Sequence, residues 1–201
     1  MTAITRPLIW RSLLWLRIDA GMDVPAVAPT LTTERLILRA ITMADWEPYA
    51  TMWQDPRVTT YISGVPRTRD VAWPKFGQAI SMWTLVGYGN WTVIERESEA
   101  FLGVAGLSDF KRGIAELDLF PEAGWAFAAE SWGRGIATEA IAAVVGWADA
   151  AGLVETRSMI DHANIVSAKV AQRCGYVPFA ELPGERRAYR RTATPPTPLK
   201  V

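Results

Sequence analysis

The alternation of apolar and polar residues marks the expected strands of this chain. Between residues 31 and 41, Leu36 and Leu38 alternate with Arg35 and Arg39, and a period of two is typical of a strand with one buried face. Short apolar runs bounded by turn residues predict the other strands. These lie at residues 91–95, 101–108, 124–128, 154–160, 177–180 and 187–191.

Helices are expected where the apolar period changes to three and four residues. The clearest helix runs from Ile136 to about Ala151 and ends at Gly152, because glycine readily adopts the left-handed conformation that closes a helix. Pro74 would either kink an earlier helix or mark its first turn. The other predicted helices cover residues 42–54, 69–85 and 164–174.

The predicted elements follow the order β-α-α-β-β-β-α-β-α-β-β. Three consecutive strands form an antiparallel meander, whereas the later β-α-β step requires a parallel neighbour. We therefore expect a mixed α/β sheet flanked by helices.

The chain of 201 residues is long enough for one domain. We expect this domain over residues 30–191, preceded by an extension at residues 1–29 and followed by a disordered tail at residues 192–201. In the extension, the apolar run at residues 13–16 is too short to span a membrane. Met22 is hypothesised to be the natural start of the protein.

Charge and cysteine content exclude several classes of protein. The 21 basic and 21 acidic side chains cancel, which argues against a nucleic-acid partner, because such proteins normally carry a basic surface. Cys174 and His162 are each the only residue of their type, so an internal disulfide and a zinc site of Cys and His ligands are excluded. We expect no metal and a cytoplasmic location.

Ten tryptophans are many for a chain of this length. Most are expected to fill the core. The alternative, that Trp83, Trp91 or Trp132 lines a ligand pocket, stays open.

A glycine-rich turn, Trp132-Gly-Arg-Gly135, joins an apolar strand to the helix that begins at Ile136. Such a helix start presents unpaired N–H groups and the positive end of the helix dipole, so it predicts an anion site, most often for phosphate. A plain turn is the alternative. A dinucleotide-binding fingerprint fits poorly, since it requires Gly or Ala where this chain has Thr138.

Three motifs in order resemble the GNAT superfamily of acyl-CoA N-acyltransferases, and its RimJ/RimL-like branch in particular. Residues 132–140 resemble the acetyl-CoA loop, with Trp132 in place of the usual first residue. Residues 33–39 resemble the opening strand. Residues 164–167, followed by Gly175 and Tyr176, resemble the Asn-x-x-Ser helix of that branch, which ends in Gly-Phe or Gly-Tyr.

The resemblance implies a GNAT fold, a mostly antiparallel twisted sheet in which one parallel pair of strands splays apart. It also implies acetyl-CoA as the acyl donor, with its pyrophosphate held by the N–H groups of Arg134 to Ala137. Gly133 and Gly135 let the backbone approach the phosphate oxygens. The residues implied to bind the cofactor are Phe127, Ala128, Trp132, Gly133, Arg134, Gly135, Ile136, Ala137, Thr138, Asn164 and Ser167.

Glu122 is the residue that the resemblance implies as the general base, acting through a water. A solvated carboxylate at the end of a strand is the alternative interpretation. His162, at the end of the next strand, is a rival base because histidine titrates near neutral pH.

The departing thiolate needs a proton. Many superfamily members use a tyrosine where this chain has Ala171, so the resemblance leaves Ser167 as the donor. Asn164 would position the groups, or simply cap its helix. The N–H of Phe127 or Ala128 would bind the acetyl carbonyl. Cys174 is interpreted as a packing residue.

These features predict an N-acetyltransferase that moves acetyl directly to a primary amine, either a protein N-terminus or a small molecule. At pH 7.5 an α-amine is about one third neutral and a lysine about one part in a thousand, so only a lysine demands a strong base. An acyl-CoA-binding regulatory module without activity is the alternative, and a nucleotide-binding oxidoreductase a weaker one. Neither the acceptor nor the choice between monomer and homodimer is predicted.

Overall fold

The computed structural model describes residues 27–193. The predictions about Met22 and about the tail beyond residue 193 lie outside these residues. Among the described residues, no helix is both long and apolar enough to cross a membrane.

Eight strands of the described chain form one sheet in the order β1-β2-β3-β4-β5-β6-β8-β7. All neighbouring strands are antiparallel except β5 and β6, which are parallel. The predicted mixed sheet is therefore confirmed. The strands are β1 (Leu31–Thr32), β2 (Leu36–Arg39), β3 (Asn90–Glu95), β4 (Phe101–Ser108), β5 (Glu122–Phe127), β6 (Glu155–Asp161), β7 (Val177–Leu182) and β8 (Arg186–Thr192).

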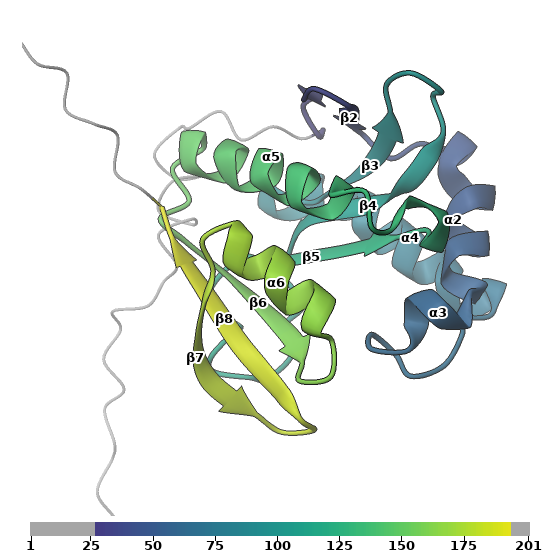
Figure 1. Ribbon diagram of the computed structural model, residues 1–201. Coiled ribbons are helices and arrows are strands. Elements are labelled where there is room, and N and C mark those ends of the chain that lie inside the picture. Colours follow the sequence, from purple (N-terminus) through teal and green to yellow (C-terminus); the bar gives the residue numbers. More distant parts are fainter. Residues whose placement is uncertain (1–26, 194–201) are drawn as a thin grey trace, which may run out of the picture.

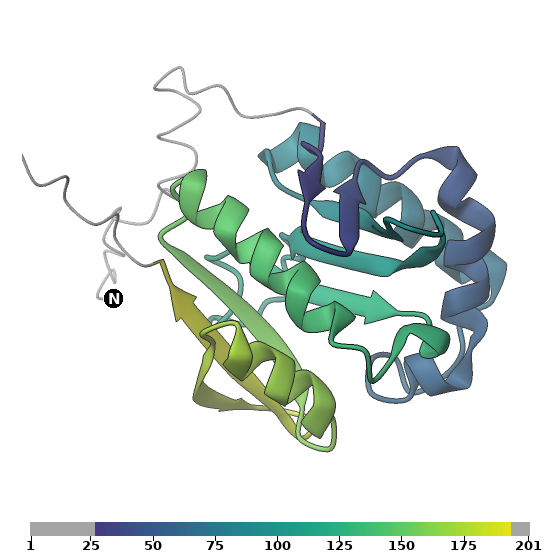
Figure 2. The same cartoon turned by 45° about the horizontal axis from the view of Figure 1, so that its top comes forward.

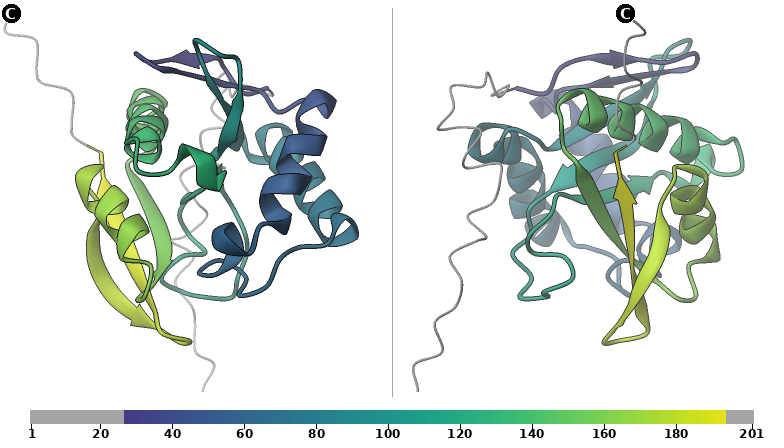
Figure 3. Two further views of the ribbon diagram at one scale, coloured as in Figure 1. Left: turned by 45° about the vertical axis from the view of Figure 1, so that its right-hand side comes forward. Right: turned by 90° about the vertical axis from the view of Figure 1, so that its left-hand side faces the viewer.

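The helices cover both faces of this sheet (Figures 1 and 3). One face carries α5 and α6, and the other carries α2, α3 and α4. They are α2 (Trp46–Gln54), α3 (Pro56–Thr59), α4 (Arg69–Val86), α5 (Ile136–Ala150) and α6 (Ile165–Arg173), with short 3-10 turns η1 (Met43–Asp45) and η2 (Ala129–Ser131).

One local prediction differs from the structure, and one of the two alternatives for Pro74 is excluded. The single strand expected over residues 31–41 is a hairpin of β1 and β2, closed by a bond from Thr33 N–H to the carbonyl of Leu36 at 3.0 Å. Pro74 lies inside α4, so it does not mark the first turn of that helix.

Each face of the sheet has its own apolar core. On one side α5 buries Ile141 and Val144 completely against the strands, beside a cluster of three tryptophans. The rings of Trp83, Trp91 and Trp147 meet edge to face at centroid distances of 4.6–5.3 Å. These residues fill the core, as predicted for most of the tryptophans.

On the opposite face, α2 and α4 pack Tyr49, Trp53 and Phe76 against Val104 and Ala126 of the strands. Aromatic rings dominate this contact, and each buried ring removes a large apolar area from water.

The parallel strands β5 and β6 separate soon after they meet. Their register contains one pair, Glu122 with Arg157, whereas β6 stays paired with β8 along its whole length. Figure 2 shows the two strands diverging, with α5 lying across one face of the sheet. This divergence opens the middle of the sheet and creates the site described next.

Candidate active site

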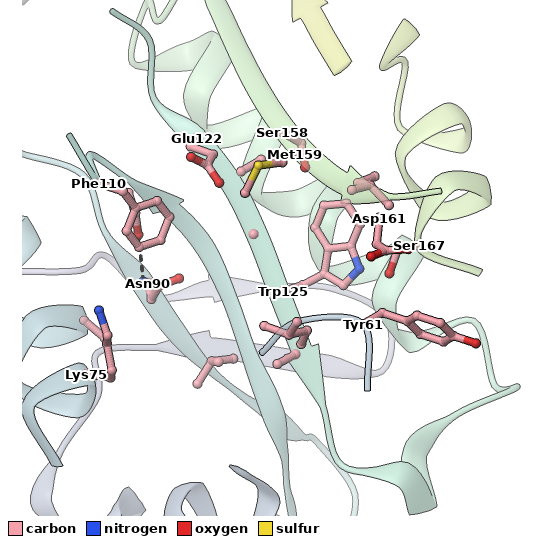
Figure 4. Close-up of a pocket in the computed structure, with 18 of the residues that line it drawn as sticks. Tyr61, Lys75, Asn90, Phe110, Glu122, Trp125, Ser158, Met159, Asp161 and Ser167 are labelled. Carbon is pink, nitrogen blue, oxygen red and sulfur yellow. Dashed lines mark hydrogen bonds between the residues drawn. The ribbon is translucent and has the colours of Figure 1, made fainter. Parts of the chain in front are cut away.

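A cavity of about 310 Å³ occupies the point where β5 and β6 diverge. Its floor comes from β4, β5 and β6, and its wall from α2 and α4. Figure 4 shows Glu122 and Asn90 toward one part of this cavity, and Trp125, Asp161 and Ser167 toward another. The carboxylate proposed as the base and the hydroxyl proposed as the acid therefore line one cavity.

Glu122 is a buried carboxylate at the start of β5, with 6% of its surface exposed. Arg112 donates to both of its oxygens, from Nε at 2.8 Å and from Nη2 at 3.0 Å. The Arg112 guanidinium also stacks on Phe110 at 4.3 Å. Each carboxylate oxygen keeps a further lone pair, so Glu122 can still accept a hydrogen bond from a water. The interpretation as a solvated strand-end carboxylate does not fit this burial.

His162, the rival base, does not line the cavity that contains Glu122. Its ring is 41% exposed, and Nε2 lies 2.7 Å from a carboxylate oxygen of Glu181. It borders a second cavity beside α6 and β8. The structure therefore separates the two candidate bases.

Two backbone N–H groups were predicted to bind the acetyl carbonyl, and one of them already forms a hydrogen bond within the sheet. Ala128 donates its N–H to the carbonyl of Leu102 at 2.9 Å, and this occupied donor corrects the prediction for Ala128. In an antiparallel pair, N–H groups point alternately toward and away from the partner strand. Those of Phe127 and Trp125 therefore point away from β4, toward the gap beside β6.

The glycine-rich turn has the backbone that an anion site requires. Gly133 and Gly135 have φ angles of +73° and +77°, in the left-handed region that glycine adopts without steric cost. No side chain caps the start of α5 at Gly135. The first N–H groups of the helix, at Ile136, Ala137 and Thr138, also have no partner within the helix, so these donors are available to a phosphate.

The side chains around this turn differ in part from the prediction. Arg134 forms an ion pair with Glu95, so its charge is shared with a carboxylate. Trp132 is half exposed and donates its indole N–H to the carbonyl of Phe127 at 2.9 Å. The indole thereby satisfies the last carbonyl of β5.

Arg35 and Glu139 anchor the turn from behind. Arg35 donates to the carbonyl of Arg134 at 2.8 Å, and its Nε donates to Glu139 at 2.7 Å. Burial raises the pKa of Glu139, but bonds from Thr33 and Arg35 outweigh it, so the pKa is lowered. A carboxylate in the first turn of a helix is also favoured by the dipole.

Asn164 caps α6, since its side-chain oxygen accepts from the N–H of Ser167 at 3.0 Å. This bond uses the backbone of Ser167 and leaves its hydroxyl free to face the cavity that it lines. Ala171, where a tyrosine acid would stand, is completely buried.

Cys174 and Tyr176 are both buried and belong to the core. Burial raises the pKa of the Cys174 thiol to about 11, so a reactive thiolate is disfavoured. Burial likewise raises the pKa of Tyr176 to about 12, and its hydroxyl lies 2.7 Å from that of Thr156. Packing accounts for both residues.

Sequence reasoning missed Arg112, Trp125, Arg35 and Glu139. Arg112 lies in the loop at residues 109–121, and no local pattern pairs it with a carboxylate ten residues away. The partners of Arg35 lie about a hundred positions further along the chain, and no local pattern reports such a contact. Among the described residues, no group of three or more His, Cys, Asp or Glu side chains could hold a metal ion.

The profile of the acetyltransferase (GNAT) domain family matches residues 35–177. This chain belongs to the GNAT acetyltransferase family. The match runs from β2 to the start of β7, and it includes Glu122, the glycine-rich turn, Asn164 and Ser167.

Individual relatives support this assignment. An uncharacterized N-acetyltransferase p20 of Bacillus licheniformis is 32% identical over 122 residues, which is 59% of this chain and 65%, just under two thirds, of that protein. A putative GNAT-family acetyltransferase from Bordetella pertussis is 27% identical with a TM-score of 0.73, and the alignment covers 82% of this chain and all of that one.

A RimL ribosomal-protein α-N-acetyltransferase in complex with coenzyme A has the same fold, with a TM-score of 0.67 and 14% identity. The alignment covers 82% of this chain and 98% of that one. The GNAT fold is therefore confirmed, and this RimL acetyltransferase shares it.

Proposed function

We propose that this GNAT protein transfers acetyl directly from acetyl-CoA to a primary amine in the cavity between β5 and β6. The observation that carries this proposal is a buried carboxylate, Glu122, in the same sheet opening that leads to the uncapped start of α5. The carboxylate can accept a proton, and the helix start can hold a phosphate.

The donor half of the site fits the pyrophosphate of acetyl-CoA. Ile136, Ala137 and Thr138 would donate backbone N–H groups, each charge-assisted bond contributing about 1.5–3 kcal/mol. The left-handed glycines keep Cβ atoms away from the phosphate. Relatives of the same fold that are described with coenzyme A support this assignment. Acetyl-CoA supplies the activated acetyl group, and all other steps fall to residues of this chain.

The acceptor half must hold a neutral amine and remove its proton. Glu122 would take that proton through a water, while Arg112 fixes the carboxylate in place through two bonds. The N–H of Phe127 or of Trp125 would donate to the acetyl oxygen as negative charge develops there. Such a donor is typically worth about 3–4 kcal/mol of barrier.

The last proton goes to the sulfur. As the amine nitrogen bonds to the acetyl carbon and the C–S bond breaks, the hydroxyl of Ser167 would donate to the leaving thiolate and regain a proton from water, while the amine proton goes to Glu122. Asn164 would hold the start of α6 so that this hydroxyl faces the cavity. A cytoplasmic location, a monomer or homodimer, and the absence of a metal requirement remain part of this proposal.

The test is the release of free thiol from acetyl-CoA across a panel of primary amines and short peptides. We expect release that depends on the amine. A protein that binds acetyl-CoA but releases no thiol with any acceptor would instead be an acyl-CoA-binding regulatory module, an alternative motivated by Ala171 in place of the usual tyrosine.

A further inference from the structure

The charged side chains that line the active-site cavity do not balance. Four are basic and two are acidic, a net charge of +2; they are Arg67, Lys75, Arg112 and Arg186 against Glu122 and Asp161. Two of the bases have an acid nearby. Arg112 pairs with Glu122, and Arg186 stands opposite Asp161 in the β6–β8 register. The surplus therefore rests on Arg67 and Lys75, at the helical wall.

Arg67 is held in place without a carboxylate. Its backbone N–H donates to the carbonyl of Trp53 at 2.8 Å, and its guanidinium lies over the Trp53 ring at 3.7 Å. No carboxylate among residues 27–193 forms an ion pair with it, and burial lowers the pKa of the Arg67 guanidinium. A fixed, partly desolvated guanidinium presents a rigid fork that matches a carboxylate or a phosphate.

The same wall carries a second, poorly satisfied donor. The indole Nε1 of Trp53 is buried, and it is the only buried side-chain nitrogen or oxygen within residues 27–193 that lacks a hydrogen-bond partner in good geometry. Its polar neighbour in the wall is the side chain of Tyr49. Burial raises the pKa of the Tyr49 hydroxyl, and the contact with the indole acts to lower it. The indole has only this poorly aligned neighbour, and the Arg67 guanidinium beside it has no carboxylate partner within residues 27–193, so the wall can bind an acceptor group of a ligand.

We propose that the acetyl acceptor is a small primary amine that carries an anionic group, bound by Arg67 at the wall formed by Tyr49 and Trp53. This inference rests on the proposed function. In β5, Ala126 packs against this wall and lies four residues beyond Glu122, a distance of about 13 Å along a strand. The anion and the proton acceptor thus occupy opposite ends of the acceptor half.

The charge pattern also disfavours other amines. Polyamines and lysine-rich peptides would bring further positive charge to a cavity that already has a surplus, and like charges repel strongly where water is excluded. The size of the cavity, about 310 Å³ including the opening between the strands, is at the lower end of small-ligand sites and fits a small acceptor rather than a folded protein surface.

The experiment compares kcat/KM for free phenylalanine, phenylalaninamide and the corresponding aminophosphonate, with 1,4-diaminobutane as a cationic amine. The amide keeps the amine and the aromatic ring but loses the anion. The proteins are the wild type, Arg67→Gln, Arg67→Lys and a matched control, Arg69→Gln. Arg69→Gln removes the same charge two residues further along the chain. Arg69 pairs with Glu47 on the surface, outside the cavity.

In the wild type we expect an anionic amine to exceed the amide by about 10- to 100-fold, the effect of one charge-assisted bond. Arg67→Gln should bring this ratio to about 1, Arg67→Lys should restore it in part, and Arg69→Gln should retain it. A preference for the phosphonate over the carboxylate would support the inference and assign phosphate as the anionic group.

In the wild type, an equal kcat/KM for phenylalanine and its amide, or a higher kcat/KM for the diamine, would overturn the inference. This result would not depend on how the variants behave. Thiol release with neutral amines in that case would leave the proposed function intact. No thiol release with any amine, while acetyl-CoA still binds, would overturn the proposed function and this inference with it.

Discussion

At the scale of single residues, the account depends first on Glu122. Glu122→Gln preserves the shape of the side chain but removes the proton acceptor, so kcat/KM should fall by about 10²- to 10⁴-fold. Steady-state thiol release measures this effect. Glu181→Gln is the matched control, because Glu181 is exposed and pairs with Arg187 outside the cavity. Wild-type activity in Glu122→Gln, with chemistry limiting turnover, would refute the assigned role.

Ser167 offers a clean test of the thiolate donor. Because the cap of α6 uses the backbone N–H of Ser167, Ser167→Ala removes only the hydroxyl. We expect kcat to fall by about 10²-fold or more with an unchanged melting temperature. Asn164→Ala is the contrasting variant, since it deletes the cap and should destabilise the protein by about 1 kcal/mol. An unchanged kcat in Ser167→Ala would mean that water protonates the thiolate.

Local motifs located some site residues and missed others. Short sequence patterns determine the local backbone at three kinds of position: the strand end at Glu122, the helix start near Ser167, and the left-handed turn at the two glycines. Arg112 and Arg67 gain their roles from tertiary contacts with Glu122 and Trp53, which no local pattern encodes. Strand pairing alone likewise explains why Glu122 is buried and why the Ala128 N–H already donates to the carbonyl of Leu102.

At the scale of elements, the start of α5 is the feature to perturb. Gly135→Ala places a Cβ on a left-handed residue, which costs about 1–2 kcal/mol, and should weaken acetyl-CoA binding by distorting the turn. Gly146→Ala is a control in the same helix: its added Cβ meets no atom within 4 Å, so it should stabilise the helix by about 0.5–1 kcal/mol. Calorimetric titration with acetyl-CoA and thermal unfolding measure both effects.

The connection between β2 and α2 depends on a buried ion pair. Asp45 is 3% exposed and accepts from Arg39 at 2.7 and 2.8 Å and from Thr92 at 3.0 Å. Burial raises the pKa of Asp45, but the bonds from Arg39, Thr42 and Thr92 outweigh it, so the pKa is lowered. Asp45→Asn should therefore lower the free energy of unfolding at pH 7 by about 3 kcal/mol.

This contribution has a defined dependence on pH. A group with a lowered folded pKa stabilises the protein fully above its unfolded pKa, about 3.9 for aspartate, and loses that effect as the pH falls through the folded pKa. The difference between wild type and Asp45→Asn, measured by urea unfolding, should be constant from pH 7 to pH 5 and shrink below pH 4. A difference that grows on acidification would contradict the assignment.

Element positions were largely predictable. The strands β3 and β4 are buried on both faces and form nearly continuous apolar runs, whereas α5 and α6 show the helical period of one buried face. The split of the first strand was not, since a turn at Thr33 depends on pairing between β1 and β2. The continuation of α4 through Pro74 also depends on context: its contacts through Ala72 and Phe76 with the second core stabilise a helix that proline alone would disfavour.

At the scale of the whole molecule, the divergence of β5 and β6 places the proposed phosphate site and the proposed acceptor site beside one opening. One face of the opening leads to the uncapped start of α5, and the other to a cavity with Glu122 and a surplus of positive charge. A parallel neighbour was predictable from the β-α-β step, but the place of β8 between β6 and β7 and the single pair that joins β5 to β6 follow from three-dimensional packing. Direct transfer requires that this opening bring acetyl-CoA and an amine together.

The most direct test follows the acetyl group itself. Wild-type protein is incubated with isotope-labelled acetyl-CoA and the best amine of the panel, and mass spectrometry then locates the label in the amine, the protein and free acetate. Direct transfer predicts label on the amine nitrogen, in proportion to the thiol released, and none covalently bound to the protein. Label that accumulates on the protein, or only in free acetate, would contradict direct transfer to an amine.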